Sequence, residues 1–248
     1  MPTLQELTDP YLDIFTAVPR SGVGVCAICR RPMSSDFDMC FSCKVTVGQV
    51  THSVGLVIPI SLYLGRMQLH HILRGYKDPG AVRLTSAQGR QFEAIVAATF
   101  ARFIHDHETH VVTGASADAI VAIPSSRGRP GNPPLFEALN RVPSLRERLR
   151  LVLAPNKPIG HQKAQDDGFL VTDNTLKGRR VLLADDTFTS GAAIQSAASA
   201  LQLAGVEVAA AIVVGRYITL SEEHGPSAEW WDEHRKSQPF TFSVCSAE

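Results

Sequence analysis

The chain of 248 residues has no excess of either charge, because Lys and Arg total 24 and Asp and Glu also total 24. It therefore lacks the basic excess that is typical of nucleic-acid-binding proteins, and the sequence does not favour such a partner. Long apolar runs are also absent. The longest, near residues 54–64, is about half as long as a membrane-spanning helix and contains Pro59. Residues 1–20 lack the apolar stretch of a signal peptide. We expect a cytoplasmic protein with no membrane partner.

Cysteine is scarce but grouped. Four of the five cysteines form two Cys-x-x-Cys pairs, Cys26 with Cys29 and Cys40 with Cys43, and Cys245 stands apart. Without an export signal, such pairs favour a metal site over disulfides. Their spacing predicts a structural zinc site with four thiolate ligands. An iron–sulfur cluster, a redox pair or plain buried thiols are the alternatives. Zinc would hold together a small module that has little core of its own.

The remaining chain alternates predicted strands and helices. Apolar residues predict strands near 119–124, 180–185 and 206–214, and helical spacing predicts helices near 67–76, 86–107 and 191–204. Strand–helix alternation predicts an α/β fold with a mainly parallel sheet flanked by helices. Three regions follow: an N-terminal helix and zinc module at 1–50, an α/β domain at 51–220, and a C-terminal tail at 221–248.

The most informative segment is 181–193, in which an apolar strand runs into two acids, a hydroxyl-rich loop and then a helix. Parallel sheets place ligand sites at the carboxyl ends of their strands. The free N–H groups at the helix start favour a phosphate, which Thr189, Ser190 and Gly191 would surround. Asp185 and Asp186 lie beside this loop, where carboxylates suit ribose hydroxyls, magnesium or a sugar cation. The alternative is a plain strand end followed by an N-cap.

This order of residues resembles the 5-phosphoribosyl-1-pyrophosphate (PRPP) signature of type I phosphoribosyltransferases, an apolar run followed by Asp-Asp, two residues and Thr-Thr-Gly-Ala-Thr. Thr187, Ser190 and Ala193 are substitutions within it. The resemblance implies a phosphoribosyltransferase-like sheet. It also implies catalytic roles for Asp185 and Asp186, with magnesium bound alongside PRPP. The 5′-phosphate loop would comprise the residues Thr187, Phe188, Thr189, Ser190, Gly191 and Ala192.

The wider chain is similar to the competence-associated, ComF-like branch of that family. The shared features are the N-terminal cysteine pairs, the Leu-Arg-Gly-Tyr-Lys-Asp-Pro-Gly stretch at 73–80, and a strand that ends at Pro124. The resemblance places a pyrophosphate loop at Ser125, Ser126 and Arg127. It also places a mobile loop before the signature, with His161 and Lys163 facing the leaving pyrophosphate. The usual arginine-rich patterns are absent from both loops.

The sequence therefore predicts an enzyme, a glycosyltransferase of the pentosyltransferase class. It would bind PRPP with magnesium, transfer the phosphoribosyl group to a small nitrogen acceptor and release pyrophosphate. A non-catalytic regulator that binds PRPP or a nucleotide is one alternative. An accessory factor in DNA uptake or DNA handling is another. Self-association is left open by the sequence.

Overall fold

The computed structural model describes residues 3–33, 37–112, 116–125, 131–221 and 225–247. Its centre is a five-stranded sheet in which every neighbouring pair is parallel, with the strand order β1-β7-β6-β2-β3. The strands are β1 (Val57–Leu64), β2 (Ala119–Ala122), β3 (Leu149–Arg150), β6 (Arg180–Phe188) and β7 (Glu207–Ile218). A separate antiparallel pair consists of β4 (Leu153–Pro155) and β5 (Phe169–Val171). The predicted α/β class with a parallel sheet and flanking helices is confirmed.

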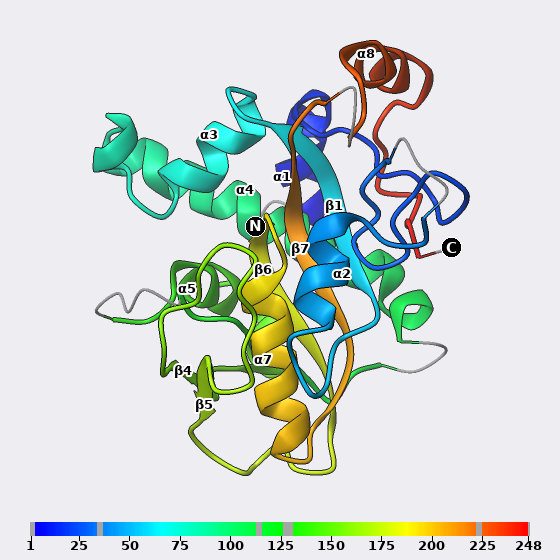
Figure 1. Cartoon of the computed structure of the whole chain (residues 1–248). Coiled ribbons are helices and arrows are strands. Elements are labelled where there is room, and N and C mark those ends of the chain that lie inside the picture. The colour runs from blue at the N-terminus through cyan, green and yellow to red at the C-terminus, as the bar shows by residue number, and fades with distance from the viewer. Residues whose placement is uncertain (1–2, 34–36, 113–115, 126–130, 222–224, 248) are drawn as a thin grey trace.

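Both faces of the sheet are covered, which explains why its strands read as continuous apolar runs. In β6, Val181 and Leu183 face one core, and Leu182 and Ala184 face the other. The helix α7 (Ala192–Leu203) covers the first face, and α4 (Ser86–Val111) packs on the second. Figure 1 shows α7 in front of the strands. The apolar residues of α4 and α7 recur at helical spacing, so each helix has one apolar face that packs against the sheet.

The connections between strands define where a ligand site can form. From β2 the chain continues to β3 on one side, whereas from β6 it passes through α7 to β7 on the other side. Adjacent strands whose connections leave in opposite directions form a topological switch point, and ligands bind outside the carboxyl ends of such strands. The residues after β2 and β6 therefore meet at the preferred site of this fold.

Several elements end at residues other than those the sequence indicated. The strand β6 continues to Phe188 instead of ending at Asp185, so the acidic pair lies within the strand. The strand β7 continues to Ile218, and α4 to Val111. Pairing with β7 extends β6, because Asp185, Thr187 and Phe188 each have a register partner there. The remaining helices of the α/β region are α3 (Gln68–Gly75), η2 (Gly80–Val82), α5 (Pro134–Asn140) and α6 (Pro143–Arg146).

The two ends of the chain pack together. The N-terminal region contains α1 (Leu4–Thr8), η1 (Asp9–Ile14) and α2 (Phe41–Val47), and the C-terminal region contains α8 (Ala228–Ser237). The Phe15 and Phe240 rings lie 4.9 Å apart, and Arg30 Nε donates to the Ser246 carbonyl at 2.9 Å. The C-terminal region is therefore a packed part of the fold, and Figure 1 shows α8 on the same side as the N-terminal loops.

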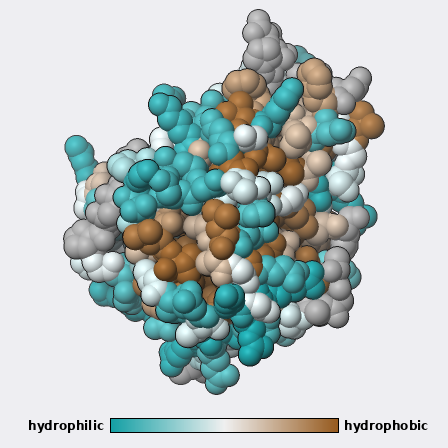
Figure 2. Space-filling view, turned by 60° about the horizontal axis from the view of Figure 1, so that its bottom comes forward, coloured by the Kyte–Doolittle hydropathy of each residue, from teal (hydrophilic) through white to brown (hydrophobic). Residues whose placement is uncertain are grey.

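No helix in the described ranges is long and apolar enough to cross a bilayer. The face in Figure 2 carries hydrophobic patches that hydrophilic residues interrupt.

Candidate functional site

The loop between β6 and α7 has the geometry of an anion site. Gly191 is the N-cap of α7 and has a φ of +85°, a region that favours glycine. A Cβ at Gly191 would lie 2.6 Å from the Phe188 ring, so only glycine fits without a shift. Thr189 is exposed and Ser190 is buried. The first N–H groups of α7 have no partners within the helix, and they carry its partial positive charge.

Asp186 is held by two residues whose role the sequence did not indicate. Its carboxylate is buried and accepts a short hydrogen bond from the Tyr76 hydroxyl. Lys77 Nζ lies 2.7 Å from Oδ1 and 2.6 Å from Oδ2 of the same carboxylate. Tyr76 and Lys77 follow α3 and belong to the 73–80 stretch that resembled the ComF-like branch. The chain itself therefore satisfies both oxygens of Asp186.

Asp185 has a different environment. Its Oδ1 accepts from the Asp186 N–H at 2.8 Å. Burial, together with the negative charge of Asp186, raises the pKa of Asp185 to about 7. A carboxyl group with a pKa near neutrality is suited to accept or release a proton during a reaction. The charge of Asp185 therefore changes near neutral pH.

Three cavities meet at the β6–α7 loop, and all three are lined by Thr187 and Thr189. One of about 220 Å³ lies between the loop and Gly160–His161. A second of about 350 Å³ extends to Pro124 and Ser125 after β2. The third, of about 300 Å³, is bordered by the polar and aromatic side chains of Tyr63, His70, Arg74, Lys77 and Tyr217. The loop is therefore surrounded by space for a ligand and by cationic groups on more than one side.

The predicted site residues differ in how they contribute. Ser125 lines the same cavity as Asp185 and Asp186, whereas Ser126 and Arg127 lie outside the described residues. His161 lines the cavity beside the β6–α7 loop, and Lys163 does not line it. Phe188 also lines this cavity, and its side chain belongs to the core on the α7 face. The remaining loop residues, Thr187 and Thr189–Ala192, border the cavities at the start of α7.

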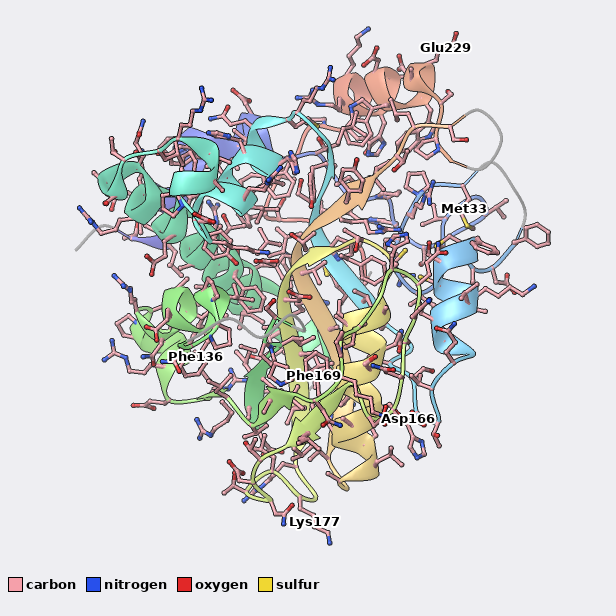
Figure 3. The ribbon with its side chains drawn as sticks, turned by 60° about the vertical axis from the view of Figure 1, so that its left-hand side comes forward. Met33, Phe136, Asp166, Phe169, Lys177 and Glu229 are labelled. Carbon is pink, nitrogen blue, oxygen red and sulfur yellow. The ribbon has the colours of Figure 1, made fainter. Side chains whose placement is uncertain are left out.

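The segment predicted to be a mobile loop is tied down on two sides. Gln162 donates from its backbone N–H to Ser190 Oγ at 3.1 Å and from its side chain to Ser42 Oγ at 3.0 Å. The Asp166 carboxylate accepts from Thr51, at 2.6 and 2.8 Å, and from Ser199 at 2.5 Å. Figure 3 shows Asp166 beside α7. This segment is thus anchored between the N-terminal module and α7.

The four paired cysteines come together, as their spacing predicted. Their Sγ atoms all lie within 4.8 Å of one another, and all four residues are buried. Cys29 Sγ lies 3.8 Å from Cys40 Sγ, which is about the separation of two thiolates on a tetrahedral zinc ion with Zn–S bonds of about 2.3 Å. Burial raises the pKa of Cys29, but hydrogen bonds from the other three thiols outweigh burial and lower it. The group can hold a metal such as zinc.

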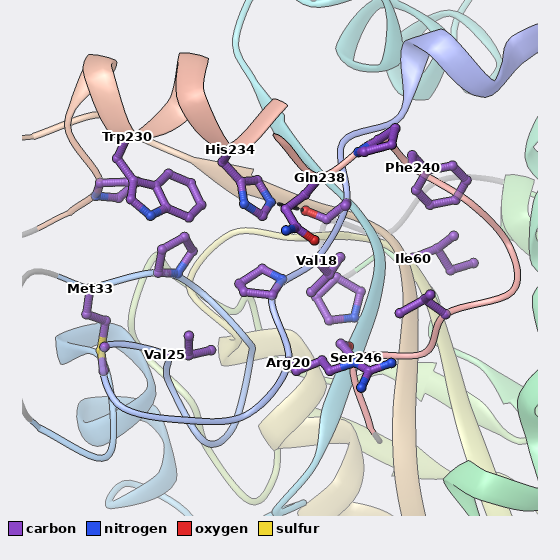
Figure 4. A pocket seen from close by; sticks show the side chains of 18 of the residues that line it. Val18, Arg20, Val25, Met33, Ile60, Trp230, His234, Gln238, Phe240 and Ser246 are labelled. Atoms are coloured by element: carbon purple, nitrogen blue, oxygen red, sulfur yellow. Dashed lines mark hydrogen bonds between the residues drawn. The ribbon is translucent and has the colours of Figure 1, made fainter. Parts of the chain in front are cut away.

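The largest cavity described lies away from the acidic pair. It has a volume of about 780 Å³ and opens between the N-terminal loops, β1 and the C-terminal region. Trp230, His234 and Phe240 border it on the C-terminal side, and Val18 and Val25 on the N-terminal side (Figure 4). His234 Nε2 lies 2.9 Å from the Ala17 carbonyl oxygen, a hydrogen bond that joins the two sides. No sequence motif indicated this cavity.

No protein-family model matches the chain, and no curated protein matches it at a significant level. Function must therefore be inferred from the residues of the site, because a fold alone does not define an activity.

Proposed function

We propose that the chain is a phosphoribosyltransferase that binds PRPP with magnesium at the β6–α7 loop. The observation that carries the proposal is the placement of an acidic pair and a glycine-capped helix start at the switch point of a parallel sheet. The three cavities around Thr187 and Thr189 supply room for the ligand. A phosphate, a ribose and a pyrophosphate need neighbouring subsites of this kind.

The 5′-phosphate would accept hydrogen bonds from Thr189, Ser190 and the free N–H groups at the start of α7. Asp185 would face the ribose, where its carboxylate can fix a hydroxyl or stabilise positive charge on the sugar. Asp186, with both oxygens engaged by Tyr76 and Lys77, positions this end of β6. Ser125 and His161 border the cavities that the pyrophosphate would reach.

The reaction breaks the bond between the anomeric carbon and the pyrophosphate oxygen, and a nitrogen lone pair forms the new bond to that carbon. The sugar passes through a state with oxocarbenium character, as in glycoside cleavage. Pyrophosphate leaves with the bonding electrons, and the nitrogen loses a proton. Asp185 would help to hold magnesium, whose charge would offset the negative charge of the leaving pyrophosphate. With a pKa raised to about 7, the Asp185 carboxylate is also suited to take up the proton.

We also propose that Cys26, Cys29, Cys40 and Cys43 bind structural zinc. The support is the separation and burial of their sulfur atoms. The proposed zinc site and the proposed PRPP site share no residue. Zinc would supply rigidity to the N-terminal module, whose α2 packs near α7.

Titration calorimetry tests the ligand site. The wild type should bind PRPP only with magnesium, and the double variant Asp185→Asn/Asp186→Asn should lose that binding. Asp173→Asn, an exposed carboxylate outside the site, is the control and should bind like the wild type. Absence of binding to folded, zinc-loaded wild type would refute the proposal.

A second candidate is a non-catalytic PRPP-binding regulator, and the occupancy of Asp186 favours it. A carboxylate that already holds Tyr76 and Lys77 is less available to magnesium or to a ribose hydroxyl. Pyrophosphate release during a screen of nitrogen acceptors separates the two candidates. Magnesium-dependent PRPP binding without pyrophosphate release from any acceptor would support the regulator.

A further inference from the structure

Arg216 carries a positive charge that is buried in the fold. It lies in β7 directly opposite Phe188 of β6, and 2% of its surface is exposed. Its guanidinium carbon lies 4.5 Å from the centroid of the Phe188 ring. Within the described ranges, Arg216 forms no ion pair with Asp or Glu. A buried charge is costly unless other groups compensate it.

The cysteine group provides that compensation. The four cysteines belong to the same buried cluster as Phe188, the ring against which the Arg216 guanidinium lies. Arg216 also forms a side-chain hydrogen bond with Cys29. Four thiolates around one Zn²⁺ carry a net charge of about −2. A guanidinium beside them is therefore stabilised most when the metal keeps all four sulfurs ionised.

At its other side, Arg216 holds the phosphate loop. Its Nη1 donates to the carbonyls of Phe188 at 3.2 Å, Thr189 at 2.5 Å and Tyr217 at 2.8 Å. In a planar trans peptide, the N–H points opposite to the preceding carbonyl. Carbonyls of Phe188 and Thr189 that point toward Arg216 therefore direct the N–H groups of Thr189 and Ser190 away from it. These are the donors that a phosphate at the start of α7 needs.

A second link runs in parallel. Gln162 joins Ser42, the residue next to Cys43 in α2, to Ser190 of the phosphate loop. Both hydroxyl contacts involve buried serines. The cysteine module therefore reaches the loop from two directions, through Arg216 beneath it and through Gln162 beside it.

We propose that Arg216 is a positioning residue that couples the cysteine metal centre to the phosphate loop, so that the metal and a phosphorylated ligand each strengthen binding of the other. The inference rests on the proposed function for the identity of the ligand. The coupling itself is a property of Arg216, the cysteines and the loop. Linkage requires it to be reciprocal: the ligand must slow metal loss if the metal strengthens ligand binding.

The test compares zinc-loaded with chelator-treated, reduced protein. Hydrogen exchange at residues 187–191 reports loop order, with β2 as the internal reference, and calorimetry with magnesium–PRPP reports affinity. In the wild type, metal removal should speed exchange at 187–191 but not in β2. It should also weaken PRPP binding about tenfold, a usual size for coupling between sites. PRPP should slow zinc release to a chelating dye.

Three variants separate positioning from general stability. In Arg216→Met, exchange at 187–191 should be fast even with zinc bound, and metal removal should add nothing. Arg216→Lys keeps the charge but not the forked donor, so it should retain zinc better than Arg216→Met and still leave the loop loose. Arg148→Met removes an arginine that pairs with Glu108 instead, and its response to metal should match the wild type.

Coupling is overturned if metal removal leaves 187–191 unchanged in the wild type, or speeds exchange uniformly across the chain. An equal metal response in Arg216→Met and wild type also overturns it. If Arg216→Met does not fold, Arg216→Lys and the wild type still decide the matter. If zinc-loaded wild type does not bind PRPP, the proposed function fails, and hydrogen exchange alone decides the coupling.

Discussion

Gly191→Ala tests how the β6–α7 loop is packed. Alanine at a φ of +85° costs about 1–2 kcal/mol relative to glycine. The added Cβ would also lie 2.6 Å from the Phe188 ring, which is buried and held against Arg216. Overpacking of this kind costs about 1–3 kcal/mol. We therefore expect Gly191→Ala to lower the free energy of unfolding by about 2–5 kcal/mol, the sum of these two ranges.

The control is Gly178→Ala. Gly178 has a φ of +73°, but a Cβ there would meet nothing within 4 Å. This variant isolates the backbone penalty of about 1–2 kcal/mol. Urea unfolding followed by circular dichroism measures both values. A double-mutant cycle with Phe188→Leu should show that a smaller side chain relieves part of the cost of Gly191→Ala.

Equal destabilisation by Gly191→Ala and Gly178→Ala would refute the close packing of Phe188 under the loop. So would a cycle in which the effects of Gly191→Ala and Phe188→Leu simply add. Either result would mean that the ring can move away freely. The loop would then lack the rigid support from which its role in phosphate binding was inferred.

Three further predictions concern the acids and the cysteines. The raised pKa of Asp185, about 7, means that the native chain keeps a proton that the unfolded chain releases near pH 4. Stability should therefore fall as pH rises from about 4 to about 7, and Asp185→Asn should remove that fall in urea midpoints. Tyr76→Phe should lower the free energy of unfolding by about 1.5–3 kcal/mol, because its hydroxyl bonds a buried carboxylate. Tyr11→Phe removes only an exposed hydrogen bond to Gln91 and should change it by less than about 0.5 kcal/mol. Cys43→Ser should lose bound zinc in mass-spectrometric metal analysis, and Cys245→Ser should keep it; equal zinc content would contradict the four-cysteine site.

Binding of PRPP at this site would require some of the contacts around Asp186 and Ser190 to break. Lys77 and Tyr76 hold Asp186 from the α3 side, and Gln162 approaches Ser190 from the other side. Each contact is local enough to break without unfolding the sheet. A ligand that recruits Asp186 must release at least one of these partners, so magnesium–PRPP binding should compete with the Lys77 ion pair.

Local features of the sequence sufficed for the strands β2, β6 and β7, for the helices α3, α4 and α7, and for the cysteine group. Strand β6, Gly191 and α7 are contiguous, and hydrophobic period and backbone preference act within such a segment. The Cys-x-x-Cys spacing likewise limits how far apart paired thiols can lie. Pairing with β7 extends β6 to Phe188, a boundary that hydrophobicity alone does not define.

The contacts that complete the site depend on tertiary structure. Tyr76 and Asp186 are 110 positions apart, and Gln162 and Ser42 are 120 apart. Nothing in the sequence near Arg216 distinguishes it from a surface arginine, yet the fold buries it between the cysteines and the β6–α7 loop. The reason is that a buried polar group forms hydrogen bonds with the groups that the tertiary fold places next to it. The sequence by itself determined the strand, the loop and the metal-ligand pairs, and only the folded chain decided which distant side chains hold them.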